Sequence, residues 1–117
     1  MKGKEQLYIV DTILPLPGTA AAVHRHYVEA YVPAACSRGL ELRHAWVSPP
    51  VWLEGDQCNT LTFVWSVIGT AAYWEAEGKA RWDATTPEFW RSLEPMIQSR
   101  TRRVMAEADD IAGLCDV

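Results

Sequence analysis

The sequence has little cysteine, and its few cysteines are not arranged for cross-linking or metal binding. Cys36, Cys58 and Cys115 are odd in number and widely separated, and no C-x-x-C spacing occurs. Disulfide frameworks and zinc sites both need paired or closely spaced cysteines. In the "HRH" stretch, His24 and His26 lie two residues apart and so on different helix faces. We therefore expect reduced thiols and no metal site.

Long apolar runs are also missing. No segment approaches the roughly 20 apolar residues that a membrane-spanning helix needs. The N-terminal "MKGKEQ" is followed by an alternating segment, not by the apolar region and small-residue cleavage site of a signal peptide. These absences predict a cytoplasmic protein that does not interact with membranes.

Positive charge and glycine-rich loops are scarce as well. The net charge is −4, and the only basic cluster is the short "RTRR" segment, residues 100–103. An extended nucleic-acid surface is therefore not expected. No glycine-rich phosphate loop occurs, and "GTAAY" at residues 69–73 lacks the glycine spacing of a dinucleotide site. We expect no nucleic-acid partner and no organic cofactor.

The 117 residues that are present, 49% of them hydrophobic and 22% charged, predict one folded domain spanning residues 1–117. Alternating apolar residues predict strands, and apolar residues at helical spacing predict helices. Strands are predicted at 5–16, 40–48, 60–68 and 100–108, and helices at 19–37 and from 70, with a restart at "TTPEFW" (85–90) and a short tail over 109–117.

The helices show which side chains should face the sheet. Tyr27 and Tyr31 belong to the apolar face of the first helix, whose turn before Pro33 should be kinked or loosened because proline lacks an N–H. Ala71, Trp74, Gly78 and Trp82 form a stripe that predicts the sheet-facing side of the second helix. After the restart, the apolar face is expected to comprise Phe89, Trp90, Leu93, Met96 and Ile97.

The order of elements predicts an α+β fold, a ferredoxin-like β-α-β-β-α-β unit with an antiparallel sheet and both helices on one face. The first and third strands carry large apolar residues on both faces. The uncovered face therefore needs a partner, and the simplest partner is a second copy of the chain. We expect a homodimer.

Three segments carry a family resemblance: "YIVDTILPLPG" (8–18), "LTFVWSVIGTAAYWEAEG" (61–78) and "TPEFW" (86–90). Over about residues 6 to 107 the chain resembles the dimeric α+β barrel superfamily, and within it the NIPSNAP and related stress-responsive barrel domains. The resemblance implies two subunits packed sheet to sheet, each with a pocket between sheet and helices. Members include cofactor-independent monooxygenases, cyclases, isomerases, haem-processing enzymes and proteins without known catalysis.

The resemblance also bears on haem. Haem-degrading members place a histidine ligand on the second helix, and this chain has no histidine after His44. Haem is therefore not expected.

The tryptophans suggest where a ligand would bind. Trp46 and Trp65 lie on neighbouring antiparallel strands, where they could form one aromatic wall for a flat apolar ligand. Together with Phe63 and Trp82 they are the predicted substrate-binding residues. Trp52, on the proline-rich loop, is interpreted as a lid or a dimer contact.

Four polar residues are the catalytic candidates. His44 or His26 is the candidate general base, and the two would converge if both face the gap between helix and sheet. Tyr27 on the first helix is the candidate proton donor. Asp11 interrupts an apolar strand, so its carboxylate must be paired or functional.

Each candidate also has a structural interpretation. His44 could be a satisfied core residue. Asp11 could form an ion pair with Arg43 or Arg103, or it could orient a histidine or remove a proton itself. Arg81 is either a surface residue or a contact for an anionic substrate group.

These observations predict a cofactor-independent enzyme that acts on a hydrophobic or aromatic small molecule by general acid–base chemistry, as an isomerase, cyclase or lyase. The first alternative is a cofactor-independent monooxygenase of aromatic substrates. The second is a non-catalytic ligand-binding or stress-related barrel protein. The enzyme hypothesis predicts a cavity reached by at least two of His26, Tyr27, Asp11 and His44.

Overall fold

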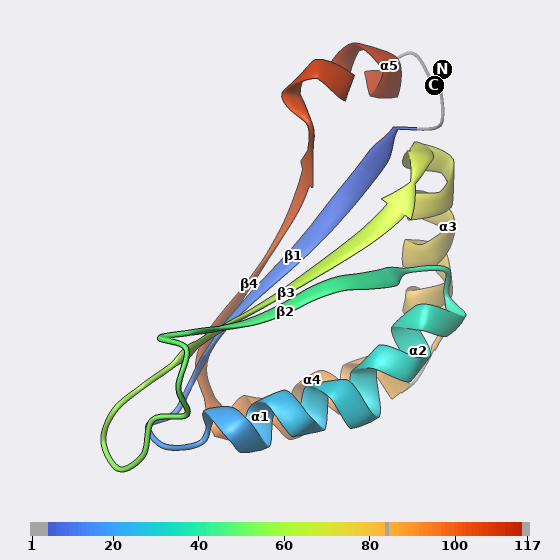
Figure 1. Cartoon of the computed structure of the whole chain (residues 1–117). Helices are drawn as coiled ribbons and strands as arrows, with labels where there is room; N and C mark the ends of the chain where they lie inside the picture. Colours follow the sequence, from blue (N-terminus) through green and yellow to red (C-terminus); the bar gives the residue numbers. More distant parts are fainter. Residues whose placement is uncertain (1–4, 84, 116–117) are drawn as a thin grey trace.

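The computed structural model describes residues 5–83 and 85–115. Figure 1 shows a twisted sheet with helices α1, α2, α3 and α4 along one face. The sheet has the order β2-β3-β1-β4, and every neighbouring pair is antiparallel. This confirms the predicted ferredoxin-like α+β fold with an antiparallel sheet. The strands are β1 (Gln6–Pro15), β2 (Glu41–Ser48), β3 (Thr60–Ile68) and β4 (Ile97–Ala106).

The first helical segment is α-helical at both ends and π-helical in the middle. It comprises α1 (Ala20–His26), the π-turn η1 (Tyr27–Tyr31) and α2 (Val32–Ser37). Pro33 cannot donate to the preceding turn, and the backbone N–H of Val32 donates to the carbonyl of Tyr27 five residues earlier. The loosening predicted before Pro33 is confirmed. Tyr27 and Tyr31 are both buried in this turn.

The second helical segment presents a different face from the one predicted. It comprises α3 (Gly69–Trp82), α4 (Thr85–Leu93) and the 3-10 turn η2 (Glu94–Met96). In α3 the buried residues are Gly69 and Ala76, whereas Trp74 is 63% and Trp82 90% exposed. The prediction that the Trp74–Trp82 stripe faces the sheet is therefore wrong, because the buried positions of α3 are occupied by the small residues Gly69 and Ala76.

Two further boundaries differ from the sequence-based prediction. Ile97 begins β4 instead of extending the apolar face of α4. The predicted tail contains the 3-10 turn η3 (Ala108–Asp110) and the short helix α5 (Ile111–Cys115). Cys36 and Cys58 are free thiols, whereas the side chain of Cys115 lies outside the described residues. In the part of the chain that the structure describes, no helix combines the length and hydropathy needed to cross a bilayer.

A β-bulge in β2 changes which side chains face the helices. Leu42 pairs with Trp65, but His44 pairs with Val64, so Arg43 is the extra residue. A shift of one residue moves every following side chain to the opposite face. His44 and Trp46 therefore lie on the outer face of the sheet, away from the helices.

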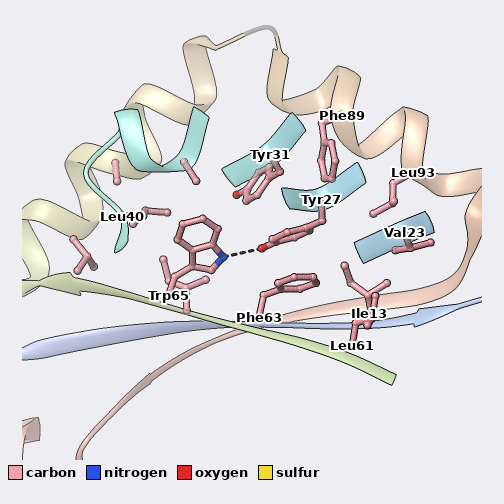
Figure 2. Close-up of a cluster of buried hydrophobic side chains, with 14 of the residues drawn as sticks. Ile13, Val23, Tyr27, Tyr31, Leu40, Leu61, Phe63, Trp65, Phe89 and Leu93 are labelled. Atoms are coloured by element: carbon pink, nitrogen blue, oxygen red, sulfur yellow. Dashed lines mark hydrogen bonds between the residues drawn. The ribbon is translucent and has the colours of Figure 1, made fainter. Parts of the chain in front are cut away.

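The core lies between the inner face of the sheet and the helices. Figure 2 shows Tyr27 and Tyr31 directed toward Phe63 and Trp65 of β3. The rings of Tyr27 and Phe63 stack with centroids 3.6 Å apart. The core is therefore aromatic at its centre, and the buried polar side chains next to it include Asp11 of β1 and Arg38 at the end of α2.

Candidate functional site

A buried ion pair joins the two strands at the centre of the sheet. Asp11 of β1 is 2% exposed and pairs in register with Arg102 of β4. Arg102 donates from Nε to Asp11 Oδ1 at 2.6 Å and from Nη2 to Oδ2 at 2.7 Å, a bidentate contact. Burial disfavours the charge of Arg102, but its hydrogen bonds and attraction to Asp11 outweigh this effect and raise the pKa of the guanidinium.

The partner of Asp11 is not one of the two arginines predicted. Arg103 pairs with Val10 and so lies on the outer face, and Arg43 forms its ion pair with Glu41 on the edge strand β2. Arg102 occupies the inner position because the antiparallel register aligns it with Asp11. The expectation that Asp11 must be paired holds, but with Arg102.

Tyr27 is the second residue that hydrogen-bonds to the Asp11 carboxylate. Its hydroxyl donates to Asp11 Oδ2 at 2.7 Å and accepts the indole N–H of Trp65 at 2.7 Å, the bond drawn in Figure 2. Burial, followed by the charge of Asp11 and the hydrogen bond to it, raises the pKa of Tyr27 above its ordinary value. Tyr27 therefore stays protonated and holds Asp11 in place.

Two arginines converge on the hydroxyl of Tyr31. Arg102 Nη2 donates to it at 2.8 Å and Arg38 Nη2 at 3.3 Å. The side chain of Arg38 is 5% exposed, and its Nε has no partner among the described residues. Asp83 lies 3.6 Å from Arg38 Nη1. We call Asp11, Tyr27, Tyr31, Arg38, Trp65 and Arg102 the Asp11 cluster.

The Asp11 cluster borders an open groove of about 770 Å³, formed by the end of α3, by α4 and by the start of β4. We call it the Trp90 groove, because the indole of Trp90 separates it from the cluster. The ring of Trp90 lies 5.1 Å from the ring of Tyr31 and 5.7 Å from the guanidinium carbon of Arg102. On the groove, Arg100 stacks over the same indole at 4.0 Å.

A second contact links the groove to the cluster. Thr86 lines the groove, and its Oγ1 accepts a long hydrogen bond of 3.4 Å from Arg38 Nη1. The side chain of Arg102 is 28% exposed, so solvent can reach the cluster. The arrangement places cationic and phenolic donors behind an aromatic wall, where they can stabilise negative charge on a bound molecule.

The predicted histidine pair does not form. His26 is half-buried between helices, where its Nε2 lies 2.7 Å from Ser92 Oγ and its ring stacks on Phe89. His44 lies exposed on the outer face and stacks on Trp46 at 4.5 Å. The two histidines are on opposite sides of the sheet because of the bulge in β2.

The predicted tryptophan wall is also divided by the sheet. Trp65 is fully buried on the inner face, whereas Trp46 is 55% exposed on the outer face. Phe63 is buried beneath Tyr27, and Trp82 points away from the core. Trp52 packs on His24 of α1 at 5.6 Å, beside a shallow pocket of about 380 Å³.

The enzyme hypothesis required a cavity reached by two of its four catalytic candidates. None of Asp11, His26, Tyr27 and His44 lines the Trp90 groove, the pocket beside Trp52 or a third, smaller pocket of about 270 Å³ near Gly39. Tyr27 and Asp11 instead lie in the cluster behind Trp90. Sequence reasoning missed the roles of Tyr31, Arg38, Arg102 and Arg100. The spacing of Tyr31 four residues after Tyr27 was the one available signal.

Comparisons with known proteins bear on the fold. Neither a protein-family model nor a curated protein matches this chain. A NIPSNAP family protein of unknown function from Agrobacterium tumefaciens matches in structure with a TM-score of 0.69 and 15% identity, over 90% of each chain. A NIPSNAP domain protein from Burkholderia xenovorans matches with a TM-score of 0.68 and 14% identity, over 87% of this chain and 94% of that one.

A candidate antibiotic biosynthesis monooxygenase from Nitrosomonas europaea has a TM-score of 0.63 and 6% identity, over 92% of this chain and 94% of that one. At such identities the likeness concerns the fold, which does not determine an activity. This chain therefore has the ferredoxin-like α+β fold that NIPSNAP family proteins and this monooxygenase candidate share.

Proposed function

We propose that this chain binds a hydrophobic or aromatic small molecule in the Trp90 groove and acts on it by proton transfer, without a metal or organic cofactor. The observation that carries the proposal is the position of Trp90, with an open groove on one side and Tyr31 and Arg102 on the other. An isomerase, cyclase or lyase needs such a combination of apolar wall and polar donors.

The Asp11 cluster supplies the polar chemistry in this proposal. Arg38 and Arg102 stabilise negative charge that develops on a substrate oxygen. Tyr31 accepts hydrogen bonds from both arginines. Its own hydroxyl proton has no acceptor among the described residues, so Tyr31 is the proposed proton donor. Because Tyr31 is buried behind Trp90 and does not line the groove, this step requires the Trp90 indole to turn aside. Asp11 and Tyr27 are positioning residues, since Tyr27 holds the Asp11 carboxylate and Asp11 holds the Arg102 guanidinium.

Specific observations favour two other functions, a cofactor-independent monooxygenase and a non-catalytic ligand-binding barrel. Stabilising a substrate anion is also what a cofactor-independent monooxygenase requires, and the candidate monooxygenase shares this fold. A non-catalytic ligand-binding barrel is favoured by the complete pairing of Asp11 within the protein. Product analysis separates the three, because exchange, oxygen uptake and simple binding are distinct results.

Tyr31→Phe is expected to slow the reaction about 100-fold, the range that a general acid contributes. Aryl ketones, aromatic lactones and phenols would be incubated with the protein in D2O, and exchange of carbon-bound protons would be followed by NMR. Tyr8→Phe, on the outer face of β1, is the matched control and should exchange at the wild-type rate.

The outcomes of this experiment are separable. Saturable binding without exchange or oxygen uptake would contradict catalysis and support the ligand-binding barrel. Oxygen uptake with a hydroxylated product would support the monooxygenase. Equal rates for wild type and Tyr31→Phe would exclude Tyr31 as the donor.

The partner proposed for the outer face of the sheet is a second copy of this chain. This face carries apolar side chains on adjacent strands, and helices α1 to α4 lie along the other face (Figure 1). Trp46 and Ile68 are more than half exposed there, and Met105 is also exposed. A sheet-to-sheet dimer would remove these side chains from water.

Val64→Lys tests the dimer. Val64 lies on a central strand, opposite Val10 of β1 on the outer face. An unpaired lysine there should weaken association by about 100-fold or more, because burying an unpaired charge costs several kcal/mol. Sedimentation velocity would measure it, with Ala71→Lys on the exposed side of α3 as the control of equal charge. A wild-type protein that is monomeric at high concentration would contradict the proposal.

A further inference from the structure

We infer that the ligand of the Trp90 groove is an aromatic or hydrophobic carboxylate, and that Arg100 is the residue that recognises its carboxylate group. The inference rests on the proposed function, since it names the ligand class of the same groove. It is carried by the charge of the groove and by the geometry of Arg100.

The groove is positively charged in a protein that is negatively charged overall. Arg81, Arg91 and Arg100 line it, and Glu94 is the single acidic residue among its described lining residues. The groove therefore carries two net positive charges, whereas the whole chain carries −4. Within residues 5–83 and 85–115, no carboxylate lies within ion-pair distance of any of these three arginines. Three guanidinium groups on one concave surface favour an anion.

The stacking of Arg100 leaves its hydrogen-bonding edge unused. Its guanidinium carbon lies over the Trp90 ring, 4.0 Å from the ring centroid, a cation–π contact. The N–H groups of Arg100 make no side-chain hydrogen bond to a described residue. A cation–π contact does not use the N–H groups of a guanidinium, so Arg100 can donate them to a carboxylate in bidentate geometry.

The rest of the lining suits the apolar part of such a ligand. Pro87, Trp90 and Ile97 line the groove beside Arg100. An aromatic body can pack on these residues while its carboxylate meets the guanidinium. Glu94 disfavours a second negative charge in the same groove, so the geometry favours a monoanion over a phosphate ester.

The test compares two ligands of the same shape. 1-Naphthoate and 1-naphthamide differ in charge and hardly at all in size, and calorimetry measures the affinity of each. The wild type is expected to bind 1-naphthoate at least tenfold more tightly, a preference that should decline with added salt. Arg100→Met, which keeps the apolar stem, should reduce the preference to less than threefold. Arg43→Met, an exposed arginine on β2, should leave it unchanged.

Each outcome of this test has a definite meaning. Equal binding of both ligands, each weakened by Trp90→Phe, would overturn the inference while the groove of the proposed function stands. A preference for 1-naphthoate that survives in Arg100→Met would also overturn it. If neither ligand binds the folded protein, both the inference and the proposed groove are contradicted. Tighter binding of 1-naphthyl phosphate than of 1-naphthoate would assign the groove to phosphate esters.

Discussion

Replacing Asp11 with alanine is expected to lower the free energy of unfolding by about 3 kcal/mol, the lower end of the range for breaking a buried ion pair. The change leaves the Tyr27 hydroxyl without an acceptor in the core and leaves the charge of Arg102 unpaired. The lower end applies because the Arg102 side chain is still 28% exposed. Urea unfolding followed by circular dichroism gives the value.

A double-mutant cycle shows whether the loss comes from the pair. Arg102→Met alone should also be destabilising, since it leaves the Asp11 carboxylate buried without its cation. The double variant Asp11→Ala/Arg102→Met should be less destabilised than the sum of the two single variants, with a coupling of about 2 kcal/mol. Strict additivity would contradict the bidentate contact.

Trp65→Ala is expected to destabilise the protein by about 3 to 5 kcal/mol, the range for deleting a large buried aromatic side chain. Trp65 is fully buried, and its indole N–H donates to the hydroxyl of Tyr27. The substitution therefore leaves a cavity beside Tyr31 and removes a donor from the Asp11 cluster.

Trp74→Ala is the matched control. Trp74 is 63% exposed on α3, so the same substitution there should change stability by less than about 0.5 kcal/mol. Thermal unfolding of both variants under one set of conditions measures the difference. Similar losses for Trp65→Ala and Trp74→Ala would contradict the assignment of Trp65 to the core and of Trp74 to the surface.

The topology could be predicted from the sequence because the strands alternate clearly and the loops end in Pro or Gly. In β1 both faces are apolar, and its residues are alternately buried and half-buried, as expected for a central strand. The face of His44 and Trp46 could not be predicted. The face on which these two side chains lie depends on one extra residue in β2, and the sequence around Arg43 does not indicate a bulge.

The face of α3 was predicted wrongly for a related reason. Large apolar residues usually mark the buried side of a helix, and Trp74 and Trp82 are the largest in α3. Here the small residues Gly69 and Ala76 are buried instead. The sequence of α3 therefore offers two candidate buried sides, one with Trp74 and Trp82 and one with Gly69 and Ala76. The packing of the helix decides which of them is buried.

The candidate site depends on long-range register, which is the part least accessible to sequence reasoning. That Asp11 needs a partner follows from its apolar surroundings. The identity of this partner depends on the pairing of β1 with β4. This pairing places Arg102 beside Asp11, although the two residues are 91 positions apart in the sequence. The same register puts Arg100 on the inner side of β4, beside Trp90.

The central claim is that the ligand site is the Trp90 groove on the helix side of the sheet. Its most direct test is a proton–nitrogen NMR titration of the labelled protein with 1-naphthoate, with the indole N–H signals assigned through Trp90→Phe and Trp46→Phe. We expect a saturable shift of the Trp90 signal and an unchanged Trp46 signal. A shift of Trp46 with no change at Trp90 would place binding on the outer face and contradict the account.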